Sequence, residues 1–124
     1  MKKYVVTGAG QGIGFELVKR LLAQGNFVIW NDVDEQVLIQ AKTQLNSVGL
    51  HHFIGIVADA SSDGFRTELL EVIKSSPGEL AGVICNAGIT TFGDFWSYSQ
   101  ESMDQILRVN IKGTFFLTQL IARY

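Results

Sequence analysis

Short apolar runs alternate with amphipathic stretches along the whole chain. Four runs, at positions 4–6, 27–30, 53–58 and 80–85, are rich in aliphatic and β-branched residues and have the length of buried strands. After each run, apolar residues recur every three or four positions, which is the pattern of a helix that buries one face. The alternation predicts parallel β-α-β units with right-handed crossovers.

Residues that cap or stop helices mark the ends of the first three predicted helices. The first helix follows a glycine-rich turn and stops at Gly25, and the second begins after Asp34 and stops at Gly49. Either Ser61 or Ser62 caps the third helix, which ends in a turn that contains proline and glycine.

The last helix is predicted to begin at Ser99 or Ser102 and to reach Tyr124. Its inner face is expected to carry Met103, Leu107, Asn110, Thr114, Leu117 and Ile121. An amide in this apolar stripe must find hydrogen-bond partners if it is buried. Nearby aromatic residues are interpreted as packing residues and not as cofactor contacts, namely Trp96, Tyr98 and Phe115.

Length, composition and charge limit the classes of protein. The 124 residues fit one domain, and 47% hydrophobic with 18% charged residues is a globular composition. The net charge is −2 without a basic run, and no apolar run has membrane-spanning length, so neither nucleic acid nor a membrane is an expected partner. His51 and His52 lack a third ligand, so no metal site is predicted. The single cysteine, Cys85, excludes an intrachain disulfide and favours a cytoplasmic protein.

The first apolar run breaks into a glycine-rich turn, Thr7-Gly8-Ala9-Gly10-Gln11-Gly12-Ile13-Gly14. Glycines permit a tight turn, and the helix that follows directs its free N–H groups and its positive dipole end at that turn. This arrangement favours a phosphate or pyrophosphate. The spacing departs from G-x-G-x-x-G, because Ile13 and Phe15 stand where the third glycine would fall.

Two aspartates follow the second and third predicted strands. Asp32 lies about twenty residues beyond the glycine turn, where a dinucleotide-binding unit places the carboxylate that binds the adenosine ribose. Asp59 stands at the carboxyl end of a strand, which is where open α/β sheets bind ligands. Position alone leaves open whether either residue is a ligand or an ordinary loop residue.

The chain resembles the short-chain dehydrogenase/reductase family. The glycine turn, Asp32 and Asp59 match its cofactor motifs, and two further motifs match at residues 86–88 (Asn-Ala-Gly) and 110–113 (Asn-Ile-Lys-Gly). The resemblance implies an α/β fold over residues 1–124, with one NAD(P)-binding, Rossmann-like domain. Its parallel sheet would have strand order 3-2-1-4 and helices on both faces, and it would be incomplete relative to the full family fold.

The resemblance also implies a site. Cofactor contacts are implied for Gly8, Gln11, Gly12, Ile13, Gly14, Asp32, Val33, Asp59, Ala60, Asn86, Ala87 and Gly88. Asn110 is implied to be catalytic, holding a water in a proton relay. Cys85 and Ala81 stand where the family usually has other residues in strand four. Neither position belongs to the glycine turn that would bind the phosphate. The family's catalytic serine and Tyr-x-x-x-Lys motif have no match here, because no tyrosine is followed by lysine four positions later.

Three functions remain open at this point. The first is hydride transfer between NAD and a small carbonyl or alcohol, performed by a longer parent protein. This chain would supply the cofactor-binding half of that protein and would be inactive alone. The second is a stand-alone nucleotide-binding or interaction module. The third is methyl transfer from S-adenosylmethionine, because residues 8–12 also spell G-x-G-x-G. Thr7 counts against the third function, because that class usually has an acidic residue there.

Two further expectations concern the cofactor and the partners. NAD is expected over NADP, because a 2′-phosphate would meet the Asp32 carboxylate. A homo-oligomer is expected, because strand four lies at a sheet edge and the last helix would expose Leu107, Phe115, Phe116 and Leu120. If the isolated chain does not self-associate through these surfaces, it is expected to be unstable.

Overall fold

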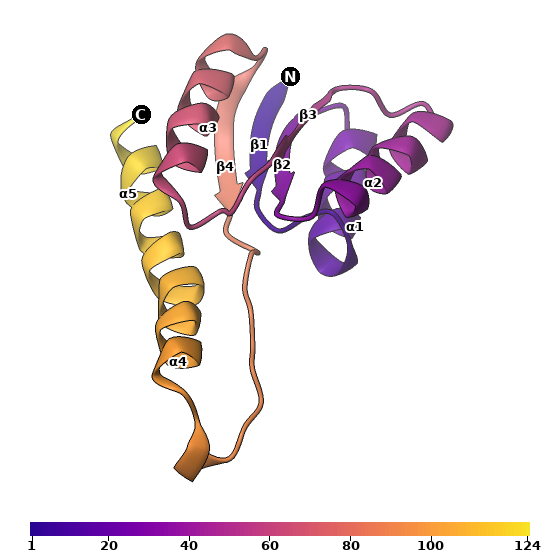
Figure 1. Cartoon of the computed structure of the whole chain (residues 1–124). Helices are drawn as coiled ribbons and strands as arrows, with labels where there is room; N and C mark the ends of the chain where they lie inside the picture. The colour runs from indigo at the N-terminus through magenta and orange to yellow at the C-terminus, as the bar shows by residue number, and fades with distance from the viewer.

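Four parallel strands form one sheet in the computed structural model, which describes residues 1–124 (Figure 1). The strands are β1 (Lys2–Val6), β2 (Phe27–Asp32), β3 (Phe53–Val57) and β4 (Glu79–Ile84). They pair in the order β3-β2-β1-β4, which confirms the predicted order. The first strand of the sequence is therefore interior, and β4 is an edge strand.

Helices cover both faces of this sheet, as predicted. They are α1 (Gly12–Ala23), α2 (Glu35–Ser47), α3 (Asp63–Ser75), α4 (Gln100–Leu107) and α5 (Thr114–Arg123). A 3-10 turn (Phe95–Ser97) precedes α4, and a π-helical turn (Arg108–Gly113) joins α4 to α5. Figure 1 shows α1 and α2 on one side of the sheet and α3 with α5 on the other. No helix has both the length and the apolar character needed to cross a bilayer.

Successive side chains of the interior strands supply two separate cores. Val6, Val28 and Trp30 pack with the inner faces of α1 and α2. Val5 and Ile29 point the other way and pack with α3 and α5. Because side chains alternate along a strand, both faces of β1 and β2 must be apolar, which explains their continuous hydrophobic runs.

The structure resolves the capping alternatives. Asp34 accepts hydrogen bonds from the N–H groups of the first turn of α2, which confirms it as that helix's cap. Ser62 caps α3 by accepting the Phe65 N–H at 3.1 Å, and Ser99 caps α4 by accepting the Ser102 N–H at 3.0 Å. Each cap satisfies donors that the first turn of a helix leaves free.

The predicted last helix is confirmed from Gln100 to Arg123, but a π-helical turn at Arg108–Gly113 lies within it. A π turn holds more residues than an α turn, so residues before and after it no longer share one face at α-helical spacing. Met103, Leu107 and Asn110 of the predicted inner stripe are exposed, whereas Leu117 is buried. Trp96 is 88% exposed, so its predicted packing role is wrong here, whereas Phe115 is 60% exposed, as expected for the face of the last helix that this chain leaves uncovered.

Candidate functional site

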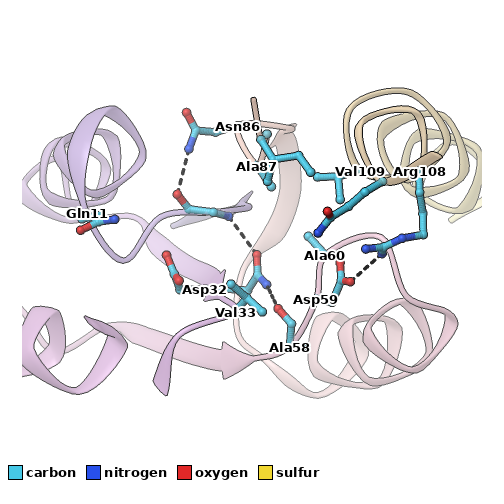
Figure 2. Close-up of a pocket in the computed structure, with 15 residues that line it drawn as sticks. Gln11, Asp32, Val33, Ala58, Asp59, Ala60, Asn86, Ala87, Arg108 and Val109 are labelled. Carbon is cyan, nitrogen blue, oxygen red and sulfur yellow. Dashed lines mark hydrogen bonds and ion pairs between the residues drawn. The ribbon is translucent and has the colours of Figure 1, made fainter. Parts of the chain in front are cut away.

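A cavity of about 390 Å³ opens at the carboxyl ends of all four strands. Figure 2 shows the labelled residues converging on it, with the end of β2 and the glycine turn on one side and Arg108 on the other. The predicted cofactor residues that line it are Gly8, Gln11, Asp32, Val33, Asp59, Ala60, Asn86, Ala87 and Gly88. The sheet edge that binds ligands in open α/β folds therefore gathers most of the predicted set.

The glycine turn packs tightly on the segment that follows β4. Gly8 has a φ of 60°, and a Cβ there would lie 2.7 Å from the Ala87 Cα. A Cβ on Gly14 would lie 2.5 Å from the Asn86 Nδ2. Both glycines are required by close approach, and Gly8 is required by its backbone conformation as well.

The start of α1 has free N–H groups. Gln11 precedes the helix and makes no side-chain capping bond. No protein acceptor binds the N–H groups of Gly12, Ile13 or Gly14. These three residues do not line the cavity, and Ile13 is 77% exposed. Uncapped donors at the positive end of a helix dipole suit an anionic group.

Two asparagines join the strand ends to the glycine turn. The Asn31 side chain accepts the Gly8 N–H at 3.0 Å and donates to the Ala58 carbonyl at 2.7 Å, so it bridges β2 to its neighbours on both sides. Asn86 Nδ2 donates to the carbonyls of Thr7 and Gly8 at 3.1 and 3.0 Å. The turn is therefore held from both sides by amide side chains.

Asp32 is held in place by two backbone donors. The Gly10 N–H donates to its Oδ2 at 3.0 Å, and the Asp34 N–H donates to its Oδ1 at 2.9 Å. A carboxylate offers about four lone-pair positions, so acceptor capacity remains on both oxygens. The side chain lines the cavity and can accept further hydrogen bonds there.

Asp59 forms a polar cluster with Ser61 and Arg108. The Ser61 N–H and hydroxyl donate to Oδ1 of Asp59 at 2.9 and 2.7 Å, and Arg108 Nη1 donates to Oδ2 at 2.6 Å and also to the Ser61 hydroxyl. Burial raises the pKa of Asp59, but the hydrogen bonds from Ser61 and the charge of Arg108 together outweigh it, so its pKa lies below the usual range. The carboxylate is therefore ionised at neutral pH.

Asn110 lies in the π-helical turn, and both polar atoms of its side-chain amide bind the backbone of Ile89. Its Oδ1 accepts the Ile89 N–H at 2.8 Å, and its Nδ2 donates to the Ile89 carbonyl at 2.7 Å. Ile89 lines the cavity, whereas Asn110 does not. The Asn110 side chain thus fixes the segment after β4, and π turns of this kind are frequent at functional sites.

Sequence reasoning missed several residues of the site, above all Asn31 and Arg108. Asn31 carried a usable signal, because it is a polar residue directly after an apolar run. The structure buries it to 2% exposure. Arg108 carried none, because its contact with Asp59 spans 49 residues of sequence. The other lining residues that were not predicted are Ala58, Ile89, Gln105 and Val109.

Comparison with known proteins identifies the family. The sequence model of the short chain dehydrogenase family matches residues 2–124, and the chain belongs to that family of oxidoreductases. A short-chain dehydrogenase/reductase of Armillaria gallica is 38% identical over 113 residues, covering 90% of this chain and 43% of the relative. The L-xylulose reductase of Caenorhabditis elegans is 33% identical over 122 residues, covering 98% of this chain and 47% of the relative. The chain therefore spans less than half the length of either relative.

A solved structure shares the fold. It is a short-chain dehydrogenase/reductase from Burkholderia phymatum in complex with NAD, which superposes with a TM-score of 0.90 at 26% identity. The superposition covers 98% of this chain and 43% of that structure. The strand order and the helices on both faces are thus those of a dinucleotide-binding family.

Proposed function

We propose that this chain forms the dinucleotide-binding part of an NAD-dependent oxidoreductase that transfers a hydride between nicotinamide and a small carbonyl or alcohol. The family membership and the NAD complex of the Burkholderia phymatum relative support the reaction class and the cofactor. The observation that carries the proposal is the fixed Asp32 carboxylate beside the uncapped start of α1. The ribose and the pyrophosphate of a dinucleotide bind to these two kinds of group.

The residues present fit NAD. A Cβ on Gly12 would meet no protein atom within 4 Å, so the space in front of the α1 N-terminus is open to a ligand. In the proposed complex the N–H groups of α1 bind the pyrophosphate, Asp32 accepts from the ribose hydroxyls, and Asp59 with Ala60 borders the adenine. NAD, when bound, supplies the nicotinamide ring that exchanges hydride.

The catalytic part of the proposal concerns Asn110. Both polar atoms of its side chain bind the Ile89 backbone, so the side chain is already occupied. We therefore propose that backbone groups of the π-helical turn bind the water. The sequence has no Tyr-x-x-x-Lys motif to supply the acid/base pair, so we propose that the 124-residue chain alone does not turn over substrate. A steady change of NADH absorbance with ketones or alcohols that purifies with this chain would contradict that. We further propose a cytoplasmic, homo-oligomeric parent protein.

The cofactor preference is tested by titration calorimetry on the parent protein that contains this chain. We expect NAD to bind about 5- to 150-fold tighter than NADP, because a 2′-phosphate would meet the Asp32 carboxylate and displace its ribose hydrogen bonds, an effect of about 1 to 3 kcal/mol. Asp32→Asn should reduce this preference, whereas the matched change Asp94→Asn, in an exposed loop outside the cavity, should leave it unchanged. Tighter binding of NADP by the unmodified protein would overturn the assignment.

A further inference from the structure

Asp59 keeps one acceptor position after its contacts within the protein. A carboxylate offers about four lone-pair positions, two on each oxygen. Ser61 fills both positions on Oδ1, and Arg108 fills one of the two on Oδ2. The Asp59 side chain is 38% exposed and lines the cavity, so its remaining lone pair is accessible to a ligand.

Arg108 places hydrogen-bond donors beside that acceptor. It is the only basic residue that lines the cavity. Both of its hydrogen bonds within the protein start from Nη1, so the Nη2 and Nε donors of the guanidinium bind no protein atom. The Arg108 side chain is 47% exposed, and Figure 2 shows its guanidinium turned toward Asp59.

Close packing fixes the two side chains relative to each other. Gly113, at the end of the π-helical turn, is buried, and a Cβ there would lie 2.9 Å from the Ser61 Cβ. The turn that carries Arg108 is therefore packed directly against the segment that follows Asp59. Arg108 Nη1 bonds both Asp59 and Ser61, so donor and acceptor stand side by side in the cavity.

We infer that Arg108 is a specificity-determining residue for the base of the dinucleotide, because the Arg108–Asp59 pair offers both a donor and an acceptor to the purine edge. Asp59 can accept from the 6-amino group of adenine, and Arg108 can donate to the 6-oxo group of hypoxanthine. The site then accepts both bases with similar affinity. Without Arg108 it presents only the acceptor, and a 6-oxo purine meets a carboxylate with no donor. This inference rests on the proposed dinucleotide function.

The test compares NAD with nicotinamide hypoxanthine dinucleotide, in which a 6-oxo group replaces the 6-amino group and N1 carries a proton. Titration calorimetry on the parent protein should give dissociation constants within about threefold of each other. In Arg108→Met the preference for NAD should rise to tenfold or more, and Arg108→Lys should lie between the two proteins. The control Arg20→Met removes the same charge from an exposed ion pair on α1 and should keep the unmodified ratio.

The outcomes separate the two proposals. If the unmodified protein binds neither dinucleotide, the proposed function fails and this inference fails with it. If it binds NAD but Arg108→Met weakens both ligands equally, or leaves their ratio unchanged, Arg108 is only structural and this inference alone is overturned. Should Arg108→Met fail to fold, Arg108→Lys decides the matter, since an unchanged ratio there also overturns the inference.

Discussion

The glycine turn and the arm of residues 90–112 are built in different ways, although both border the same cavity. The first part of the turn, at residues 7–10, packs closely on its surroundings, and amide side chains that follow neighbouring strands satisfy its polar groups. The arm extends away from the sheet (Figure 1) and is tied to the site by two polar contacts, Asn110 with Ile89 and Arg108 with Asp59. The turn is thus fixed by close packing, whereas the arm is fixed by a few hydrogen bonds that also face solvent. Substitutions in the two regions should therefore differ in kind.

The largest effect is expected for Gly8→Ala. A Cβ there would force a left-handed conformation on alanine and would lie 2.7 Å from the Ala87 Cα. Strain of about 1 to 2 kcal/mol and overpacking of about 1 to 3 kcal/mol should together lower the free energy of unfolding by about 2 to 5 kcal/mol. Denaturant unfolding measures the change. The control is Gly64→Ala in the first turn of α3, where a Cβ meets open space and should cost nothing.

A smaller effect is expected for Asn110→Ala in the arm. The change removes both hydrogen bonds to the Ile89 backbone, but water can replace them because this contact is exposed. The free energy of unfolding should fall by about 1 kcal/mol. Amide hydrogen exchange at Ile89 should accelerate, while exchange in β1 stays slow. A loss of stability as large as that of Gly8→Ala would show that the arm is as rigidly packed as the turn.

The smallest effect concerns the pH dependence of stability at Asp59. Because its pKa is lowered in the folded protein, its contribution to stability is present above the ordinary aspartate pKa and is lost as the pH falls through the folded value. Arg108→Met should bring the pKa of Asp59 closer to the ordinary value, so stability should fall less steeply below about pH 5. Unfolding curves of the two proteins between about pH 2 and pH 5 decide this. Parallel curves would mean that Arg108 contributes nothing to the charge of Asp59.

The sheet could be predicted from the sequence because its signals are local. Continuous apolar runs mark strands buried on both faces, and Asp34 lies directly before the helix that it caps. The glycine turn and Asp32 were found for the same reason, because their spacing reflects one β-α-β unit. The strand order followed from the family resemblance, and the structure agrees with it.

The arm could not be predicted in the same way. Its π-helical turn leaves no residue signature, so a stripe drawn at α-helical spacing carried Asn110 to the wrong face. The pairing of Arg108 with Asp59 depends on the three-dimensional path of the chain between them. Asn31 shows the intermediate case, because its position at the end of a strand was visible but its two partners were not.

The interior position of β1 also affects how the chain can fold during synthesis. β1 leaves the ribosome well before its second neighbour, β4, which begins only at Glu79. At about 5 to 20 residues per second, one edge of β1 would stay unpaired for roughly 4 to 15 seconds after that strand has been made. An apolar nascent strand open for that long is a binding site for chaperones and a starting point for aggregation. The yield of folded protein should therefore depend on translation speed between β1 and β4 more than on speed after them.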